Sequence, residues 1–332
     1  MIQTPNKVQL DFFEKIKQRI PENESFPERI AEVLGLSADS TYRRIRGVTS
    51  LTLEEMVTLC NHFKVSFDLG AANVGETGLV TFHYRTISDN ESRMLEYLQD
   101  LNRHLKYISQ FKNKLVIYAA EDVPVFHHFK FAKLTAFKVF YWKKSLLDEE
   151  LLSNAVFEFG KVDAELIKIA RENYELYSRI PTIEIWTEAT LDSTVKQLEY
   201  YYDSGIITRE QARVICGEVL EMLANIEEMA VKSRKDKDGY GEYKMYYSDV
   251  MIGTNAVLAR LEDTITAFLS FDGFNNLTTT DAELCKEVNK WMEILIKKSS
   301  LVSGINEKQR IMIFKKIKNK AEMLMNHILQ SE

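Results

Sequence analysis

Residues 26–68 read FPERIAEVLGLSADSTYRRIRGVTSLTLEEMVTLCNHFKVSFD, and this stretch decides the fold of the N-terminal part of the chain. Its apolar residues recur at helical spacing in three short runs, which predicts three short helices. A turn at Gly35-Leu36 separates the first helix from the second, and the second ends in the arginine-dense run YRRIRG. The pattern therefore predicts a compact helical region with an arginine-rich middle helix.

Capping residues support these helix boundaries. Ser25 with Glu28, and Thr52 with Glu55, have the S/T-x-x-E spacing of capping boxes, and Ser37 can cap the middle helix. A further amphipathic helix is expected over about residues 5–20. The predicted core of the three helices consists of Phe26, Ile30, Leu34, Tyr42, Ile45, Met56, Val57, Cys60 and Phe63.

The order of these elements resembles the Cro/lambda-repressor-like (XRE) family of helix-turn-helix transcriptional regulators. The runs IAEVLGLS, YRRIRG, LTLEEMVTLCNHF and VSFD carry the resemblance, over about 50 residues. Ala31, Gly35 and Gly47 match the family's small residue and its two glycines. Tyr42 and Ile45 lie one residue later relative to Gly35 than in the usual pattern, which predicts a longer turn. The resemblance implies an all-α helix-turn-helix bundle that binds a double-stranded DNA operator.

The middle helix would then be the recognition helix. Arg43 is expected to pair with a guanine edge through its guanidinium fork, while the hydroxyls and the other two arginines reach bases or phosphates. The alternative is a solvated arginine cluster on a structural helical bundle. The candidate DNA-binding residues are Ser37, Asp39, Ser40, Thr41, Arg43, Arg44 and Arg46.

Bulk composition limits these interpretations. The net charge is -6, and basic and acidic residues are roughly balanced over 1–70, so DNA affinity must come from local arginine placement. Cys60, Cys216 and Cys285 form no CxxC motif, which argues against a zinc site or a disulfide framework and favours reduced thiols. The N-terminus lacks a signal-peptide pattern, and apolar runs such as LVIYAA are too short for a membrane span. We therefore expect a cytoplasmic protein with no membrane partner, no metal and no cofactor.

Beyond a Gly-rich linker the pattern changes to a larger, helix-rich α+β domain. The predicted organisation is a helix-turn-helix domain over 1–70, a linker over 71–78 and a sensor or dimerisation domain over 79–332. The charged loop 232–244 could be disordered, and the domain could divide into two lobes near 235–244. Predicted strands cover 79–85, 114–119 and 182–186, with a three-stranded meander at 245–252, 256–261 and 264–269. Predicted helices cover 128–147, 158–178, 191–202, 208–231, 281–298 and 306–328.

Candidate chemistry in this domain is sparse. His127 and His128 are adjacent and so point to different faces, which disfavours a metal pair. Glu184 and Glu188 flank Trp186 on a predicted strand and are expected to face solvent. The remaining aromatic residues could line a ligand pocket, but core packing is favoured. They are Tyr200, Tyr201, Tyr202, Trp142 and Trp291.

No GxGxxG, P-loop, HExxH or GxSxG motif occurs, so we expect a non-enzyme. The favoured interpretation is a sequence-specific, homodimeric one-component transcriptional regulator with a small-molecule or peptide effector. The last predicted helix is basic and amphipathic, and could add a DNA surface, form a dimer face or simply be solvated. Two alternative functions remain: an enzyme carrying a regulatory helix-turn-helix module, and a protein-interaction scaffold.

Overall fold

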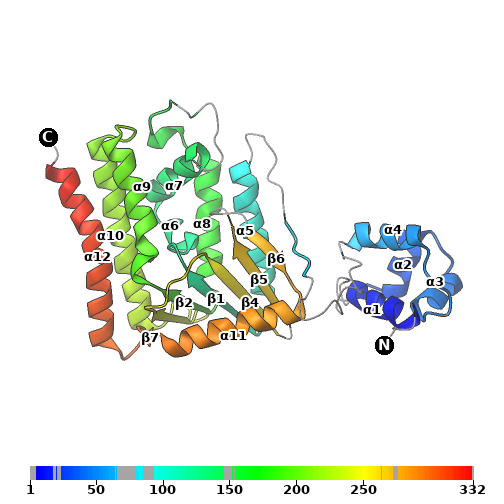
Figure 1. The fold of residues 1–332 in the computed structure, drawn as a ribbon. Helices are drawn as coiled ribbons and strands as arrows, with labels where there is room; N and C mark the ends of the chain where they lie inside the picture. The colour runs from blue at the N-terminus through cyan, green and yellow to red at the C-terminus, as the bar shows by residue number, and fades with distance from the viewer. Residues whose placement is uncertain are drawn as a thin grey trace. The chain divides into compact units, whose positions relative to one another are not determined.

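The computed structural model describes residues 5–17, 20, 24–63, 65, 80–84, 93–145, 152, 154–262, 264–271 and 276–330. The chain forms two compact units, Met1–Thr81 and Phe82–Glu332 (Figure 1). The predicted linker 71–78 lies outside the described residues. Of the predicted strand 79–85, residues 80–84 are described, and His83 there forms an isolated antiparallel bridge with Thr278.

The N-terminal unit is helical. Its helices are α1 (Pro5–Lys17), α2 (Phe26–Leu34), α3 (Ala38–Ile45) and α4 (Leu53–Phe63). The buried hydrophobic side chains come from α1, α2 and α4, and they are Phe12, Phe13, Ile16, Ile30 and Leu59. Six of the predicted core residues pack around them: Phe26, Leu34, Ile45, Met56, Cys60 and Phe63.

Two predicted core residues are exposed instead. Tyr42 is 45% exposed and Val57 is 52% exposed, so both are wrong in the core prediction. The inward position of α3 is occupied by Thr41, which is completely buried. Because Ile45 stays in the core while Thr41 takes the place of Tyr42, the inward face of α3 is shifted by about 50° from the predicted phase, half the rotation between neighbouring residues. The expected capping box at Ser25 is also absent, since the Ser25 side chain makes no capping hydrogen bond.

The C-terminal unit contains a mixed sheet in the order β6-β5-β4-β1-β2-β3-β7. Strands β1, β2 and β3 are parallel to one another, and the other neighbouring pairs are antiparallel. The strands are β1 (Lys114–Ala120), β2 (Thr182–Trp186), β3 (Tyr243–Tyr247), β4 (Ala256–Leu261), β5 (Thr264–Ser270), β6 (Asn276–Thr279) and β7 (Ser300–Leu301).

Helices cover both faces of this sheet (Figure 1). One face supports the larger core, to which α5 (Arg93–Gln110), α6 (Val125–His128), α7 (Ala132–Ser145), α8 (Ala164–Ser178), α9 (Asp192–Asp203), α10 (Arg209–Lys232) and α12 (Glu307–Gln330) contribute. The opposite face packs on α11 (Ala282–Lys298) through Cys285, Met292 and Leu295. Short 3-10 helices η3 (Phe159–Lys161) and η4 (Glu188–Leu191) complete the described elements.

Strand order corrects the predicted meander. β4 and β5 form the expected hairpin, but β3 pairs with β2 and β7 rather than with β4. Strands from both sides of 235–244 therefore share one sheet, and the described structure has no division into lobes there. The loop before β3 is also ordered: Arg234 bridges to Glu242, and Lys235 is buried.

One role expected for the last helix was that of a dimer face, and the packing of α12 bears on this expectation. Its apolar side chains pack along α10 within the same unit, with Phe314, Ile317 and Leu324 buried. Two of its lysines pair within the unit, Lys318 with Glu227 and Lys320 with Asp192. Most of the apolar stripe of α12 is thus used inside the fold, whereas Ile311 at its start is 54% exposed.

Candidate nucleic-acid interface

The turn between α2 and α3 is set by Gly35. This glycine has φ 62 and ψ 33, in the left-handed region that residues with a Cβ rarely adopt, and so it ends α2. The amide of Leu36 then donates to the carbonyl of Ala31 at 3.0 Å. Two residues later Ser37 caps α3, because its hydroxyl accepts a hydrogen bond from the amide of Ser40 at 3.4 Å.

Thr41 belongs to the scaffold of α3 and not to its surface. Its side chain is completely buried, and its hydroxyl donates to the carbonyl of Ser37 at 3.0 Å. A β-branched residue with its polar atom satisfied by the preceding turn can occupy an interior position at little cost. Thr41 is therefore removed from the candidate DNA contacts.

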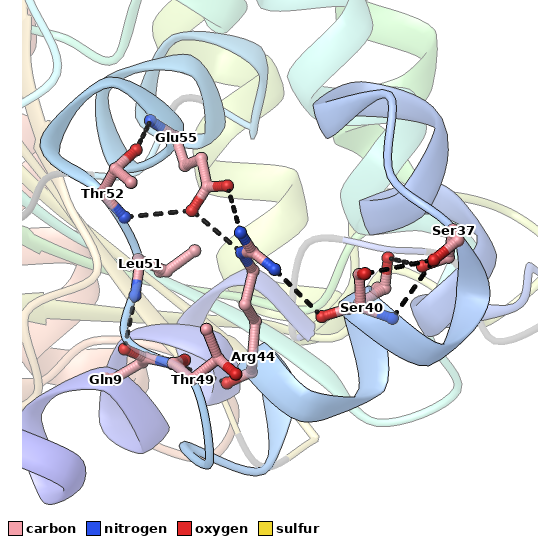
Figure 2. Close-up of polar contacts among 9 residues, drawn as sticks. Gln9, Ser37, Ser40, Arg44, Thr49, Leu51, Thr52 and Glu55 are labelled. Atoms are coloured by element: carbon pink, nitrogen blue, oxygen red, sulfur yellow. Dashed lines mark hydrogen bonds and ion pairs between the residues drawn. The ribbon is translucent and has the colours of Figure 1, made fainter.

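Arg44 is held by α4 (Figure 2). Its Nε donates to Glu55 Oε2 at 2.9 Å, its Nη2 lies 2.8 Å from Oε1, and its Nη1 donates to the carbonyl of Ser40 at 3.2 Å. The two side chains of the ion pair are only 16% and 17% exposed. Because the guanidinium fork is already occupied, Arg44 orients α3 and is corrected from a phosphate contact to a positioning residue.

Glu55 takes part both in the ion pair with Arg44 and in the cap at the start of α4. Its carboxylate accepts from the amide of Thr52 at 3.0 Å, while the Thr52 hydroxyl accepts from the amide of Glu55 at 3.1 Å. This reciprocal pair is the predicted capping box of α4. Burial alone would raise the pKa of the Glu55 carboxyl, but the hydrogen bonds from Arg44 and Thr52 and the charge of Arg44 lower that pKa overall.

Gln9 of α1 braces the corner that follows α3 (Figure 2). Its Nε2 donates to the carbonyls of Arg44 and Thr49, at 2.6 and 2.9 Å, and its Oε1 accepts from the amide of Leu51 at 2.9 Å. Gly47 makes the turn between them with φ 70. One amide side chain thus fixes both ends of the corner. Sequence reasoning missed Gln9, because no local pattern links it to a segment 35 residues away.

The solvent-facing side of α3 presents a stripe of four exposed residues, Asp39, Tyr42, Arg43 and Arg46, here called the α3 stripe. Their spacing places them on adjacent turns of one helix face. The guanidinium carbon of Arg46 lies 5.8 Å from the centre of the Tyr42 ring, within cation–π range. Among the other predicted contacts, Ser37 is exposed and Ser40 is half-buried at the start of α3. The structure therefore keeps Arg43 and Arg46 available and adds Tyr42, which the sequence assigned to the core.

A second concentration of chemistry lies inside the C-terminal unit, around Glu184 on β2. This carboxylate is completely buried, contrary to the expected solvent-facing position. It accepts from Tyr177 at 2.7 Å, from Trp186 Nε1 at 2.8 Å and from Tyr243 at 3.0 Å, and lies 2.8 Å from His127 Nε2. With four partners supplied by α6, α8, β2 and β3, the carboxylate is fully satisfied and ties these elements together.

Burial and charge in this network shift the pKa values of Glu184 and Lys235. Burial alone would raise the pKa of Glu184, but His127, Tyr177 and Lys235 lower it to about 2. Burial lowers the pKa of Lys235 to about 7, and the negative charges of Glu184 and Asp236 only partly oppose this. The Lys235 ammonium lies 3.6 Å from the centre of the Tyr177 ring and donates to Thr182. These contacts join α6, α8, β2 and β3 around one buried carboxylate, which makes Glu184 a structural hub of the unit.

A third polar cluster lies at the carboxyl ends of β1 and β2, where open α/β sheets commonly bind ligands. Lys138 of α7 is buried and donates to Thr194 and Gln197, both at 2.8 Å, while its Nζ lies 3.9 Å from Asp122 Oδ2. Thr194 is also 3.5 Å from Nε2 of His128, whose Nδ1 is buried without a partner in the described part of the chain. This cluster is therefore a candidate ligand site of the unit.

The histidine pair is divided between these two clusters, as adjacent residues on one helix turn require. Burial, together with the positive charges of Lys138 and His127, lowers the pKa of His128 well below its ordinary value. Among the described residues, no group of three or more His, Cys, Asp or Glu could hold a metal ion. The aromatics are mostly packing residues: Trp142, Trp186 and Tyr201 are buried, while Tyr200 and Trp291 are exposed.

No described helix is long and apolar enough to cross a membrane. Comparison of the chain with protein-family models, with curated proteins and with solved structures gave no match.

Proposed function

We propose that this protein is a sequence-specific DNA-binding transcriptional regulator whose α3 is the recognition helix. The observation that carries the proposal is the α3 stripe: two exposed arginines and an exposed tyrosine on one face of a short helix whose Thr41 and Arg44 are held internally. The helical unit and its Gly35 turn have the parts of a helix-turn-helix motif. The inward Thr41 also supports the resemblance, since it removes the one-residue offset that an inward Tyr42 implied, while the inward Ile45 keeps its offset.

The size of α3 suits this role. Its 8 residues make a helix about 12 Å long, comparable with the width of the DNA major groove. Arg43 is the candidate for a guanine edge, because a guanidinium can pair with O6 and N7 together. Arg46 is the candidate for a phosphate contact at the end of the helix.

The internal bracing supports recognition rather than adaptable binding. Ser37, Arg44 and Gln9 fix the start, the middle and the end of α3 through hydrogen bonds within the unit. A recognition helix held this way loses little conformational entropy on binding. The two exposed arginines also weigh against a pure protein-interaction scaffold, for which a positively charged face would be unnecessary.

The test is a binding assay with the full-length protein on genomic fragments and random duplexes. Arg43→Ala is expected to relax base preference at one position and weaken specific binding by about 1–3 kcal/mol. Arg46→Ala is expected to weaken binding across sequences and to reduce the salt dependence by about one counterion. Arg213→Ala is the matched control, since it removes the same charge from an exposed pair with Glu210 on α10. If both α3 variants bind like the parent and like this control, the proposal fails.

Homodimerisation remains part of the proposal for a mechanical reason. One short helix reads few base pairs, and a second half-site supplies the missing affinity and specificity. The support from α12 is reduced because most of its apolar face is buried against α10. Light scattering of the full chain, free and on DNA, tests this part, and a one-to-one complex on the selected site would contradict it.

A second candidate function comes from the Lys138 cluster. Its mutually close titratable groups are what an enzyme with a regulatory helical module would need, and also what an effector site would need. Within the regulator proposal, this cluster is the candidate site for a small-molecule or peptide effector. Thermal shifts of the full chain with panels of small carboxylates, phosphates and amines, compared between the parent and Lys138→Met, test for binding there. Turnover of a bound compound would favour the enzyme.

A further inference from the structure

Tyr42 lies on the exposed face of α3, although the helical unit has a hydrophobic core against which it could have packed. The interior position next to it is filled by Thr41, so the phenol ring is not needed for the core and is 45% exposed. It lies in the α3 stripe between a carboxylate, Asp39, and two arginines. The ring is the one large apolar group in the otherwise polar α3 stripe.

The ring is also held in place. Arg46, four residues further along α3, places its guanidinium carbon 5.8 Å from the ring centre. Arg44 does not compete for the ring, because Glu55 and the Ser40 carbonyl occupy its fork. An oriented aromatic ring costs less conformational entropy on binding than a free one, so the pair is suited to a specific contact.

We infer that Tyr42 is a specificity-determining residue that reads thymine through its 5-methyl group. The inference rests on the proposed function, and it names the base that the α3 stripe selects besides the guanine assigned to Arg43. In the major groove, purine edges and cytosine present polar atoms, and the thymine methyl is the distinct apolar feature. The ring of Tyr42 supplies the apolar surface that such a methyl group needs, while its hydroxyl remains free to reach solvent or phosphate.

The experiment removes the methyl group and nothing else. Full-length protein first selects its preferred sites from random duplexes. Each thymine of the best site is then replaced in turn by deoxyuridine, and affinities are measured for the parent, Tyr42→Phe and Tyr42→Ala. We expect one or two thymines per half-site at which deoxyuridine weakens binding by the parent about fivefold, the worth of one buried methyl group.

The variants separate the tyrosine contact from an effect on DNA shape. Tyr42→Phe keeps the ring and should keep the deoxyuridine effect, whereas Tyr42→Ala should bind thymine and deoxyuridine sites equally. Because Tyr42 is exposed, both variants should retain the parent's melting temperature. A parent that is insensitive to every deoxyuridine, or Tyr42→Ala that retains the full effect, overturns this inference while leaving DNA binding intact. Failure to enrich any sequence would instead overturn the proposed function, and this inference with it.

Discussion

Arg44 and Glu55 join α3 to α4 through two contacts of 2.9 and 2.8 Å, in an ion pair that is largely withdrawn from solvent. The same carboxylate closes the capping box of α4 through the Thr52 amide. The angle between the two helices is thereby coupled to the start of α4. Arg44 thus fixes the position of α3 against α4, whereas its neighbours Arg43 and Arg46 remain exposed to a partner.

Arg44→Ala is expected to destabilise the helical unit by about 1–3 kcal/mol, because it leaves Glu55 partly buried without its charged donor. Hydrogen exchange of α3 and α4 peptides in the full-length protein measures this directly. Arg43→Ala is the control, since it removes the same charge from the exposed side of the same helix. Equal exchange in the two variants would show that the ion pair does not hold α3.

Acidification should lower the stability of the helical unit that contains Glu55. The folded pKa of Glu55 is below its ordinary value, so its stabilising contribution is present above about pH 4.5 and is lost as the pH falls through the folded pKa. The protection of α4 amides against exchange, relative to the intrinsic exchange rate at each pH, should therefore fall more steeply below about pH 4.5 in the parent. In Glu55→Gln, residue 55 does not titrate, and the fall should be smaller. Parallel profiles for the two proteins would contradict this role of Glu55.

The C-terminal unit should show a stronger acid dependence through Glu184. Its pKa of about 2 means that stabilisation is complete above about pH 4.5 and falls as the pH drops from there toward 2. Glu184→Gln should lower the free energy of unfolding at neutral pH by roughly 3–5 kcal/mol and flatten this acid limb. Urea unfolding followed by tryptophan fluorescence reports it, because Trp186 donates to Glu184. Glu188→Gln, on an exposed carboxylate of the adjacent η4, should change little.

Local sequence pattern predicted many of the elements, but it missed the helix α5 and the strands β6 and β7, and it did not predict how the strands pair. The strand 182–186 was predicted with its observed ends, since its alternation is a local property. The position of β3 beside β2 depends on a parallel pairing across more than fifty residues, and no local pattern encodes that partner. Glu184 shows the same limit: it was expected to face solvent, and the donors from α6, α8 and β3 that permit its burial are distant in the sequence.

The phase of α3 is a different kind of failure. Size and hydrophobicity favoured Tyr42 as the inward residue, whereas the fold buries the smaller Thr41 by closing its hydroxyl on Ser37. Of the predicted DNA contacts, Thr41 is therefore buried and Arg44 is bound to Glu55. Arg43 and Arg46 are exposed. Sequence composition identified the arginine cluster but could not say which arginine is free.

Gly241 offers a sharp test of the ordered loop before β3. A Cβ at this position would lie 1.9 Å from the carbonyl oxygen of Ser178, a contact with backbone that cannot easily move. Gly241→Ala should therefore destabilise the C-terminal unit by about 3 kcal/mol. Gly253→Ala is the matched loop control, since a Cβ there meets nothing within 4 Å. Similar unfolding midpoints for the two variants would mean that the loop before β3 is free to shift.

Gln9 acts on α3 from another helix, α1. Gln9→Ala removes three hydrogen bonds to the corner formed by residues 44–51, each worth about 1 kcal/mol. We expect faster exchange of the amides in this corner and a several-fold loss of DNA affinity with unchanged base preference, since no base-contacting group is removed.

Two further variants make the role of the Gln9 side chain specific. Gln9→Glu retains an acceptor for the Leu51 amide but places a negative charge against the Arg44 and Thr49 carbonyls, so it should resemble Gln9→Ala rather than the parent. Leu10→Ala alters the neighbouring residue, which is 40% exposed, and should leave both exchange and affinity unchanged. If Gln9→Ala loosened the corner without lowering affinity, DNA recognition would not depend on how firmly α3 is held. The bracing would then serve the stability of the helical unit alone.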